Sequence, residues 1–374
     1  MKKTLIALSL AALSTAAVAD VTLYGQIKAG VEISRTKVKA GGVSAKSHTT
    51  TQIADFGSRI GFKGHESIGN NLNAIWQIEN KTSVAGNNSG WSNRESFIGL
   101  EGDFGKFRAG NLNTQLDNMG NLDPWEYDNQ ALGLKTFQRT DERVVSARYD
   151  TPVFGGFSAN VQFTPRDNQA DSGRATPLSD TSAYYAGLNY ENAGFFAQYG
   201  LAYKKSAYVG VGKTGDSKSA QAHRVIAGYD ANNLFVGAGY QFTNGWDTLN
   251  SYKATQNGGN AYGIDAKGDI VASKYNAAAD GSQRIKTHEL ALTGAYRFGN
   301  VTPRLSYVHG FQAKGKGLSA DEKKSVKYNQ VVLGADYDFS KRTTAFAQAG
   351  WLKSGSGNNK ADTTGGLVGL RHKF

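Results

Sequence analysis

The stretch "VTLYGQIKAGVEI", residues 21–33, alternates between apolar or small residues and polar ones. Val21, Leu23, Ile27 and Val31 share one phase, and Gln26 falls in the other. A period of two is typical of a β-strand with one apolar and one polar face. A soluble sheet buries its apolar face in a core, whereas a membrane barrel turns that face towards lipid and keeps water inside. The alternation alone permits both arrangements.

The composition favours the barrel. The 374-residue chain has 46 glycines, five prolines and no cysteine, and only 39% of its residues are hydrophobic. Eighteen tyrosines and eighteen phenylalanines are many for so polar a chain, and a disordered chain would be poor in them. A large barrel with a wet lumen combines a polar interior with aromatic girdles at the two membrane surfaces.

Residues 1–19 have the features of an export signal. Lys2 and Lys3 precede an apolar stretch from residue 5 to residue 12, and the small residues 17–19 form a cleavage site. The alternative is a membrane-anchor helix, but the apolar stretch is shorter than the roughly 20 residues that span a bilayer. The sequence therefore predicts a signal peptide over 1–19 and a single β-barrel over 20–374.

Strand-like segments recur along the whole chain, and no long helical periodicity interrupts them. Their number is about sixteen, and an even number of antiparallel strands is the rule for bacterial single-chain barrels. We place them near residues 21–34, 52–65, 72–80, 92–101, 104–112, 140–150, 157–165, 182–190, 194–205, 221–229, 234–243, 285–298, 301–311, 326–339, 342–353 and 363–374.

The connections between these segments alternate between short and long. Tight turns such as "ENAG" (191–194) and "DANN" (230–233) alternate with long connections such as 112–138 and 244–284. Every second connection lies at the same end of a barrel. Short periplasmic turns and long external loops are the asymmetry of an outer-membrane barrel.

Several longer motifs resemble those of the neisserial and related β-proteobacterial general porins, and the resemblance runs from the signal peptide to the final phenylalanine. It implies a sixteen-stranded barrel in the Gram-negative outer membrane, a homotrimer, passive diffusion of ions and small hydrophilic solutes, and a third external loop folded into the lumen. The motifs are "DVTLYGQIKAGVE", "DFGSRIGFKGHE", "NRESFIGL", "VSARYDTP", "AYRFGNVTPRLSYVHGF", "GADYDFSKRT" and "VGLRHKF".

Four basic residues are candidates for one wall of a pore constriction. Lys28 shares the polar phase of the first strand, and Arg59 alternates with the apolar Ile60, so both are expected to face the lumen. The resemblance assigns Arg59 to a basic cluster at the constriction, and Arg94 and Arg139 match further positions of that cluster. The alternative for each is a solvated residue with no particular effect on permeation.

The opposite wall is expected to be the third long loop, residues 113–137. It carries Asp117, Asp123, Glu126 and Asp128, with Trp125 as an anchor against the barrel wall. At about 25 residues it far exceeds the usual connection of ~4–6 residues. Acidic groups facing basic ones within the ~8 Å Debye length at physiological salt would create a transverse field that is not screened. The alternative is a flexible acidic surface loop.

The formal net charge is +11, or +9 once Lys2 and Lys3 are removed with the signal peptide. A positive excess within the lumen would favour a weak anion preference, because it raises the local anion concentration. Nucleic acid is not an expected partner, since the basic residues are dispersed and the chain is exported. Exposed loop lysines such as Lys204 and Lys314 are expected to meet lipopolysaccharide and other outer-membrane lipid.

The leading function is thus a general diffusion porin. The alternative is a surface adhesin that contacts host cells through its external loops, with channel activity secondary. An enzyme is not expected, because no nucleophile, base and orienting acid form a recognisable motif. No cofactor is expected, and the six histidines show no metal-ligand spacing, so no metal site is expected either.

Overall fold

The computed structural model describes residues 20–86, 91–166, 182–205, 207, 218–277 and 280–374. The predicted signal peptide, residues 1–19, lies outside these ranges. No helix in the described part of the chain is long and apolar enough to cross a membrane.

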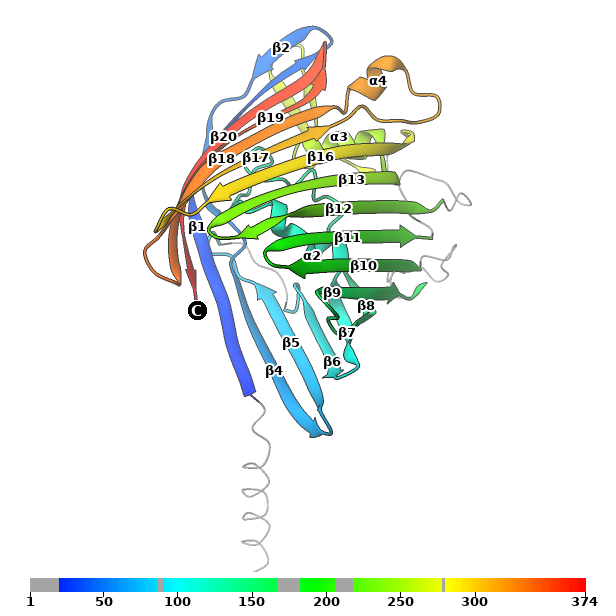
Figure 1. The fold of residues 1–374 in the computed structure, drawn as a ribbon. Helices are drawn as coiled ribbons and strands as arrows, with labels where there is room; N and C mark the ends of the chain where they lie inside the picture. The colour runs from blue at the N-terminus through cyan, green and yellow to red at the C-terminus, as the bar shows by residue number, and fades with distance from the viewer. Residues whose placement is uncertain (1–19, 87–90, 167–181, 206, 208–217, 278–279) are drawn as a thin grey trace, which may run out of the picture.

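The described residues form one large antiparallel sheet that closes on itself (Figure 1). Its segments, in chain order, are β1 (Asp20–Ala40), β2 (Val43–Lys46), β3 (Thr50–Asp55), β4 (Arg59–Gly69), β5 (Leu72–Lys81), β6 (Ser96–Gly102), β7 (Gly105–Asn113), β8 (Arg143–Asp150), β9 (Phe157–Thr164), β10 (Ala183–Asn192), β11 (Phe195–Lys204), β12 (Ala220–Ala231), β13 (Leu234–Thr248), β16 (Arg284–Tyr296), β17 (Val301–Gly310), β18 (Tyr328–Asp338), β19 (Thr343–Ser356) and β20 (Asn359–Lys373).

The first strand closes the barrel by pairing on both of its sides. On one side β1 pairs with β20, with Ala29 opposite Leu370. On the other side it pairs in turn with β2, β3 and β4, which act as one interrupted strand. The eighteen segments of the sheet therefore make sixteen barrel strands in the described residues, which confirms the predicted fold.

The polarity of the opening strand is inverted relative to a soluble sheet. The side chains of Val21, Leu23 and Ile27 are 57%, 52% and 46% exposed, whereas Gln26 and Glu32 are 7% and 2% exposed. A single strand thus places its apolar residues on the outer surface and its polar residues inside. This is the arrangement of a barrel in lipid, where the apolar face meets acyl chains.

Aromatic residues gather on the outer surface near both ends of the strands. Their rings pack on one another, as in an aromatic girdle. Pairs near the short turns are Phe157–Tyr190, Phe195–Tyr229, Tyr296–Phe298 and Tyr337–Phe339, and pairs nearer the long loops are Phe163–Tyr184, Tyr184–Tyr203, His223–Phe242 and His309–Phe311.

The antiparallel order of the strands places every second connection at the same end of the barrel, and the local backbone conformation makes the connections there short. Asn232 and Asn233 join β12 to β13 with φ of 53° and 65°, the left-handed conformation that two-residue hairpin turns favour. Ala193 and Gly194 join β10 to β11 in the same way. At the other end most connections are long, but residues 41–42 between β1 and β2 and residues 357–358 between β19 and β20 are two-residue turns.

Three external connections contain structure that alternation did not indicate. The third connection includes α2 (Gln115–Asn118) and the 3-10 turn η1 (Gly120–Leu122). Beyond β13, which continues five residues past its predicted end, lie α3 (Leu249–Gln256) and a separate hairpin of β14 (Asn260–Ile264) and β15 (Ile270–Lys274). The connection after β17 includes α4 (Ala320–Lys324).

Candidate functional site

The third connection, residues 114–142, lies against the polar face of the strands. Near its start Gln115 donates to Asn189 Oδ1 and accepts from Asn160 Nδ2, both at 2.7 Å. Further along, the buried Trp125 donates from Nε1 to Ser306 Oγ at 2.9 Å. These contacts cross from β9 and β10 to β17, so the connection extends over the inner surface of a large part of the wall.

Glycines in the wall provide the space for this close approach. A Cβ atom at Gly187 would lie 2.4 Å from the Gln115 side chain, and one at Gly239 would lie 2.4 Å from Leu122. At Gly350 a Cβ would lie 1.9 Å from a backbone oxygen of the loop. Only glycine lets backbone and loop meet at these distances. The high glycine content therefore serves the loop as well as the turns.

A buried arginine on β12 holds the two ends of the loop. Arg224 is fully buried and donates to the carbonyl oxygens of Leu116 (2.9 Å) and Phe137 (3.0 Å). It also forms an ion pair with Asp141 at 2.7 Å. Burial raises the pKa of Asp141 to about 7, and the Arg224 charge opposes that rise. The guanidinium thus replaces water for loop groups that would otherwise be buried without partners.

Arg139 also anchors the loop. Unlike Arg224, it belongs to the loop, and its side chain extends into the barrel wall. Its guanidinium forms ion pairs with Asp247 at 2.9 Å and with the fully buried Glu289, and it donates to Thr287 at 2.7 Å. It also lies over the ring of Tyr252 at 4.4 Å. The Arg139 side chain is only 4% exposed, so its contacts are with the protein and it is not part of an open pore surface.

Arg59 and Arg94 lie together on the wall formed by β4, β5 and the segment before β6. Both form ion pairs with Glu79, at 3.5 Å for Arg59. Their side chains are 35% and 26% exposed, so both contact solvent. On the loop side, Asp117 forms an ion pair with Arg143 at 3.7 Å. Burial raises the pKa of Asp117, while Arg143 and Arg94 lower it, which places all three charges in one electrostatic cluster.

Lys28 and Glu126, expected on opposite walls, are in direct contact. Glu126 also accepts from Arg371 at 2.7 Å, and Arg371 lies 3.6 Å from Asp336. Asp336 pairs in turn with Arg304. This network fastens the middle of the loop to the strands on both sides of the closure between β1 and β20.

The remaining acids of the loop have different surroundings. Asp123 accepts from Tyr127 Oη and from the Leu134 amide, both at 3.0 Å, and burial raises its pKa to about 7. It therefore stabilises the fold of the loop itself. Asp128 is exposed, and its backbone amide donates to Glu32.

Several charged residues of this wall were not among the predicted set. Arg371 follows the outward-facing Leu370 on the last strand and therefore points inwards. Arg224 precedes the exposed Val225 on β12 and also points inwards. Alternation therefore signals their direction. It does not signal which of them meets the loop. No cluster of potential metal ligands occurs in the described residues.

Comparison of the chain with known protein families, sequences and structures agrees with this architecture. A family model described as Gram-negative porin matches residues 28–374. The major outer membrane protein P.IB of Neisseria sicca is 50% identical and that of Neisseria meningitidis serogroup B is 46% identical, with all of both chains covered. An anion-selective porin from Comamonas acidovorans has the same fold, with a TM-score of 0.64, 21% identity, and coverage of 95% of this chain and all of that one. The chain therefore belongs to the Gram-negative porin family and is a β-barrel protein of the outer membrane.

Proposed function

We propose that the chain forms a passive, water-filled channel through which ions and small hydrophilic solutes diffuse. The observation that carries the proposal is the inverted polarity of the strands, since β1 exposes Leu23 and Ile27 while it buries Gln26 and Glu32. A polar interior in a sixteen-stranded barrel leaves room for electrolyte. Membership of the porin family supports the same function.

We further propose that the narrowest part of this channel lies between the loop and the strands β4 to β8. There Arg59, Arg94 and Arg143 share a cluster with Asp117. Lys28, paired with Glu126, belongs to the adjoining network. Arg139 and Asp123 are excluded from the proposed pore lining, because their polar groups are bound within the protein.

The balance of these charges supports a weak anion preference. In the ion-pair networks around these two clusters, eight basic side chains meet six acidic ones within the described residues; the pairs of Arg139, Arg224 and Lys204 add three basic and four acidic side chains, which leaves an excess of one. A positive excess raises the anion concentration in a narrow pore. The eight basic ones are Lys28, Arg59, Arg94, Arg108, Arg143, Arg148, Arg304 and Arg371, and the six acidic ones are Glu79, Glu95, Asp117, Glu126, Asp150 and Asp336.

The proposed surroundings of the barrel follow from its outer surface. The exposed apolar residues of β1 and β20, such as Ile27 and Val368, suit contact with lipid and with a second barrel in a homotrimer. Lysines in the long loops, such as Lys314 and Lys316, are exposed and suit the anionic surface of lipopolysaccharide. The same loops are the part of the chain available for contact with host cells.

Purified protein in a planar bilayer tests this function. We expect stepwise conductance in potassium chloride without any added ligand, and a reversal potential in a salt gradient that is displaced towards the chloride equilibrium value. A folded protein with no conductance would contradict the channel. A reversal potential displaced towards potassium would contradict the anion preference alone.

A further inference from the structure

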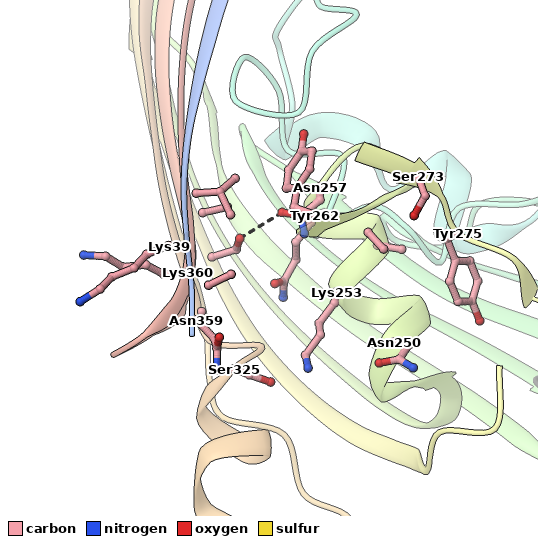
Figure 2. Close-up of a pocket in the computed structure, with 18 of the residues that line it drawn as sticks. Lys39, Asn250, Lys253, Asn257, Tyr262, Ser273, Tyr275, Ser325, Asn359 and Lys360 are labelled. Atoms are coloured by element: carbon pink, nitrogen blue, oxygen red, sulfur yellow. Dashed lines mark hydrogen bonds between the residues drawn. The ribbon is translucent and has the colours of Figure 1, made fainter. Parts of the chain in front are cut away.

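A cavity of about 620 Å³ with a mixed polar and apolar lining lies at the external end of the barrel, beside the channel entrance (Figure 2). Its walls come from α3, the β14–β15 hairpin, α4 and the residue that follows it, and the ends of β1, β19 and β20. The lining is rich in amides and hydroxyls, including Asn250, Asn257, Ser273 and Ser325. Two aromatic side chains, Tyr262 and Tyr275, complete it.

The wall of this cavity is held by specific contacts. A capping box between Thr248 and Ser251 begins α3 directly after β13. At the other end of the helix, Gln256 donates to the Val326 carbonyl oxygen at 2.7 Å. Asn257, the helix C-cap, accepts from Ser354 on β19 at 3.2 Å, as Figure 2 shows. These contacts fix α3 to two other parts of the barrel rim. The helix therefore forms a fixed wall of the cavity.

Lys253 extends into the cavity without an ion-pair partner in the described residues, and Lys39, Lys274 and Lys360 also contribute to the lining. In Figure 2, Lys253 projects from α3 into the space that Ser325 and Asn359 border. No carboxylate in the described part of the chain lies within ion-pair distance of its ammonium. Burial lowers the pKa of Lys253, and the more distant Glu322 only partly opposes this effect. An anionic ligand would restore the electrostatic stabilisation that burial removes.

The carboxylates that line the cavity do not form ion pairs with Lys253, and two of them have other partners. Asp280 already accepts from Tyr275 at 2.7 Å, from Asn250 at 3.2 Å and from the hydroxyl of Thr248. Asp321 and Glu322 belong to α4, where Glu322 accepts from the Ser319 amide at 2.8 Å as part of a capping box.

The cavity adjoins the entrance of the channel. A second cavity of about 580 Å³ opens over the third loop and is lined by Arg35 and Lys135. Gln256, Asn257 and Tyr262 line both spaces, so α3 and the hairpin form a partition between them. A solute held on one side of this partition lies next to the path that other solutes take into the barrel.

We propose that this cavity is a binding site for small hydroxylated carboxylic acids, the class of the sugar acids. The Lys253 ammonium would receive the carboxylate. The side chains of Asn250, Asn257 and Ser325 would bond to hydroxyls, and the faces of Tyr262 and Tyr275 would pack against the C–H surface of the ring. The site rests on the proposed function in one respect, because it would concentrate such solutes beside a diffusion channel.

Single-channel recording with sodium glucuronate as the probe tests the site. We expect glucuronate, added on the loop side, to reduce the chloride current or raise its noise in a saturable way. Glucose lacks the carboxylate and acetate lacks the hydroxyls, so both are expected to act at least tenfold more weakly. Lys253→Met should raise the half-saturating glucuronate concentration at least tenfold while conductance in potassium chloride alone stays unchanged.

Two further variants make the result specific. Lys39→Met is the matched control, since it removes the same charge from the same rim, where Figure 2 shows the side chain pointing away from the cavity. It should keep the wild-type response. Ser325→Trp should abolish the response by filling the cavity while Lys253 remains.

An absent glucuronate effect in a wild-type channel that conducts normally would overturn the site and leave the channel intact. So would an equal response in the Lys253→Met and Lys39→Met variants. Absence of conductance in potassium chloride would instead contradict the proposed function.

Discussion

Replacing Arg224 by methionine is expected to release the third loop from the wall. The variant keeps a side chain of similar length but loses the charge that binds Asp141 and the donors that bind Leu116 and Phe137. Removing one partner of a buried ion pair costs about 3–5 kcal/mol, because the remaining charge stays buried and unpaired. That cost falls on the loop, since the strand pairing of β12 uses backbone groups only.

The release should be visible in two measurements. Open-channel current noise should rise several-fold, and trypsin should cut after Lys135, whose side chain is exposed but whose neighbours Leu134 and Thr136 are buried in the seated loop. Arg297→Met is the matched control. Arg297 lies in the turn between β16 and β17, is 52% exposed, pairs with Asp338 and donates to the Gly299 carbonyl oxygen, so its loss should change neither reading. If the Arg224→Met protein has wild-type current noise and is not cleaved after Lys135, Arg224 does not hold the loop.

Replacing both Arg59 and Arg94 by serine should move the selectivity of the channel towards cations. These two side chains are among the more exposed basic groups of the inner-wall networks, and both pair with Glu79. Without them Glu79 loses both ion-pair partners and keeps the hydrogen bond from the Tyr24 hydroxyl, so the local potential becomes more negative. We expect the chloride-to-potassium permeability ratio to fall by a factor of about two or more at low salt, and less at high salt.

The reversal potential in a potassium chloride gradient measures this ratio. Arg148→Ser is a useful comparison, because Arg148 belongs to the same face but is only 4% exposed and is held by Asp150. Its loss should alter selectivity less than the loss of the exposed pair. A wild-type reversal potential in the double variant would show that Arg59 and Arg94 do not line the constriction.

The strands could be predicted from the sequence because each carries a local signal. Alternation along residues 21–33 indicates a strand wherever its partners lie, and the sixteen predicted segments all correspond to barrel strands. The structure adds length at the external ends, where β1 continues to Ala40 and β13 to Thr248. Those extensions carry no lipid-facing stripe, and so the alternation that marks a membrane strand fades there.

The pairing of charges could not be predicted in the same way. Alternation indicates whether a side chain points inwards, but not its height along the barrel or the course of a long loop. Lys28 and Glu126 meet although 98 residues separate them, and Arg371 joins them from the last strand. Arg139 aligned with a pore position by resemblance, yet the loop turns it into the wall, towards Glu289 and Asp247. Such contacts depend on the register of the whole closed sheet.

The absence of cysteine from the chain allows a direct test of the inverted polarity on which the account depends. Single cysteines placed along β1 can be treated with a charged, membrane-impermeant thiol reagent while the current through the reconstituted protein is recorded. We predict that reagent lowers or alters the current at positions 24 and 28, and that it has no effect at positions 23, 27 and 31. Current changes at positions 23, 27 and 31 but not at 24 and 28, or at all of these positions alike, would contradict a barrel whose polar face encloses the channel.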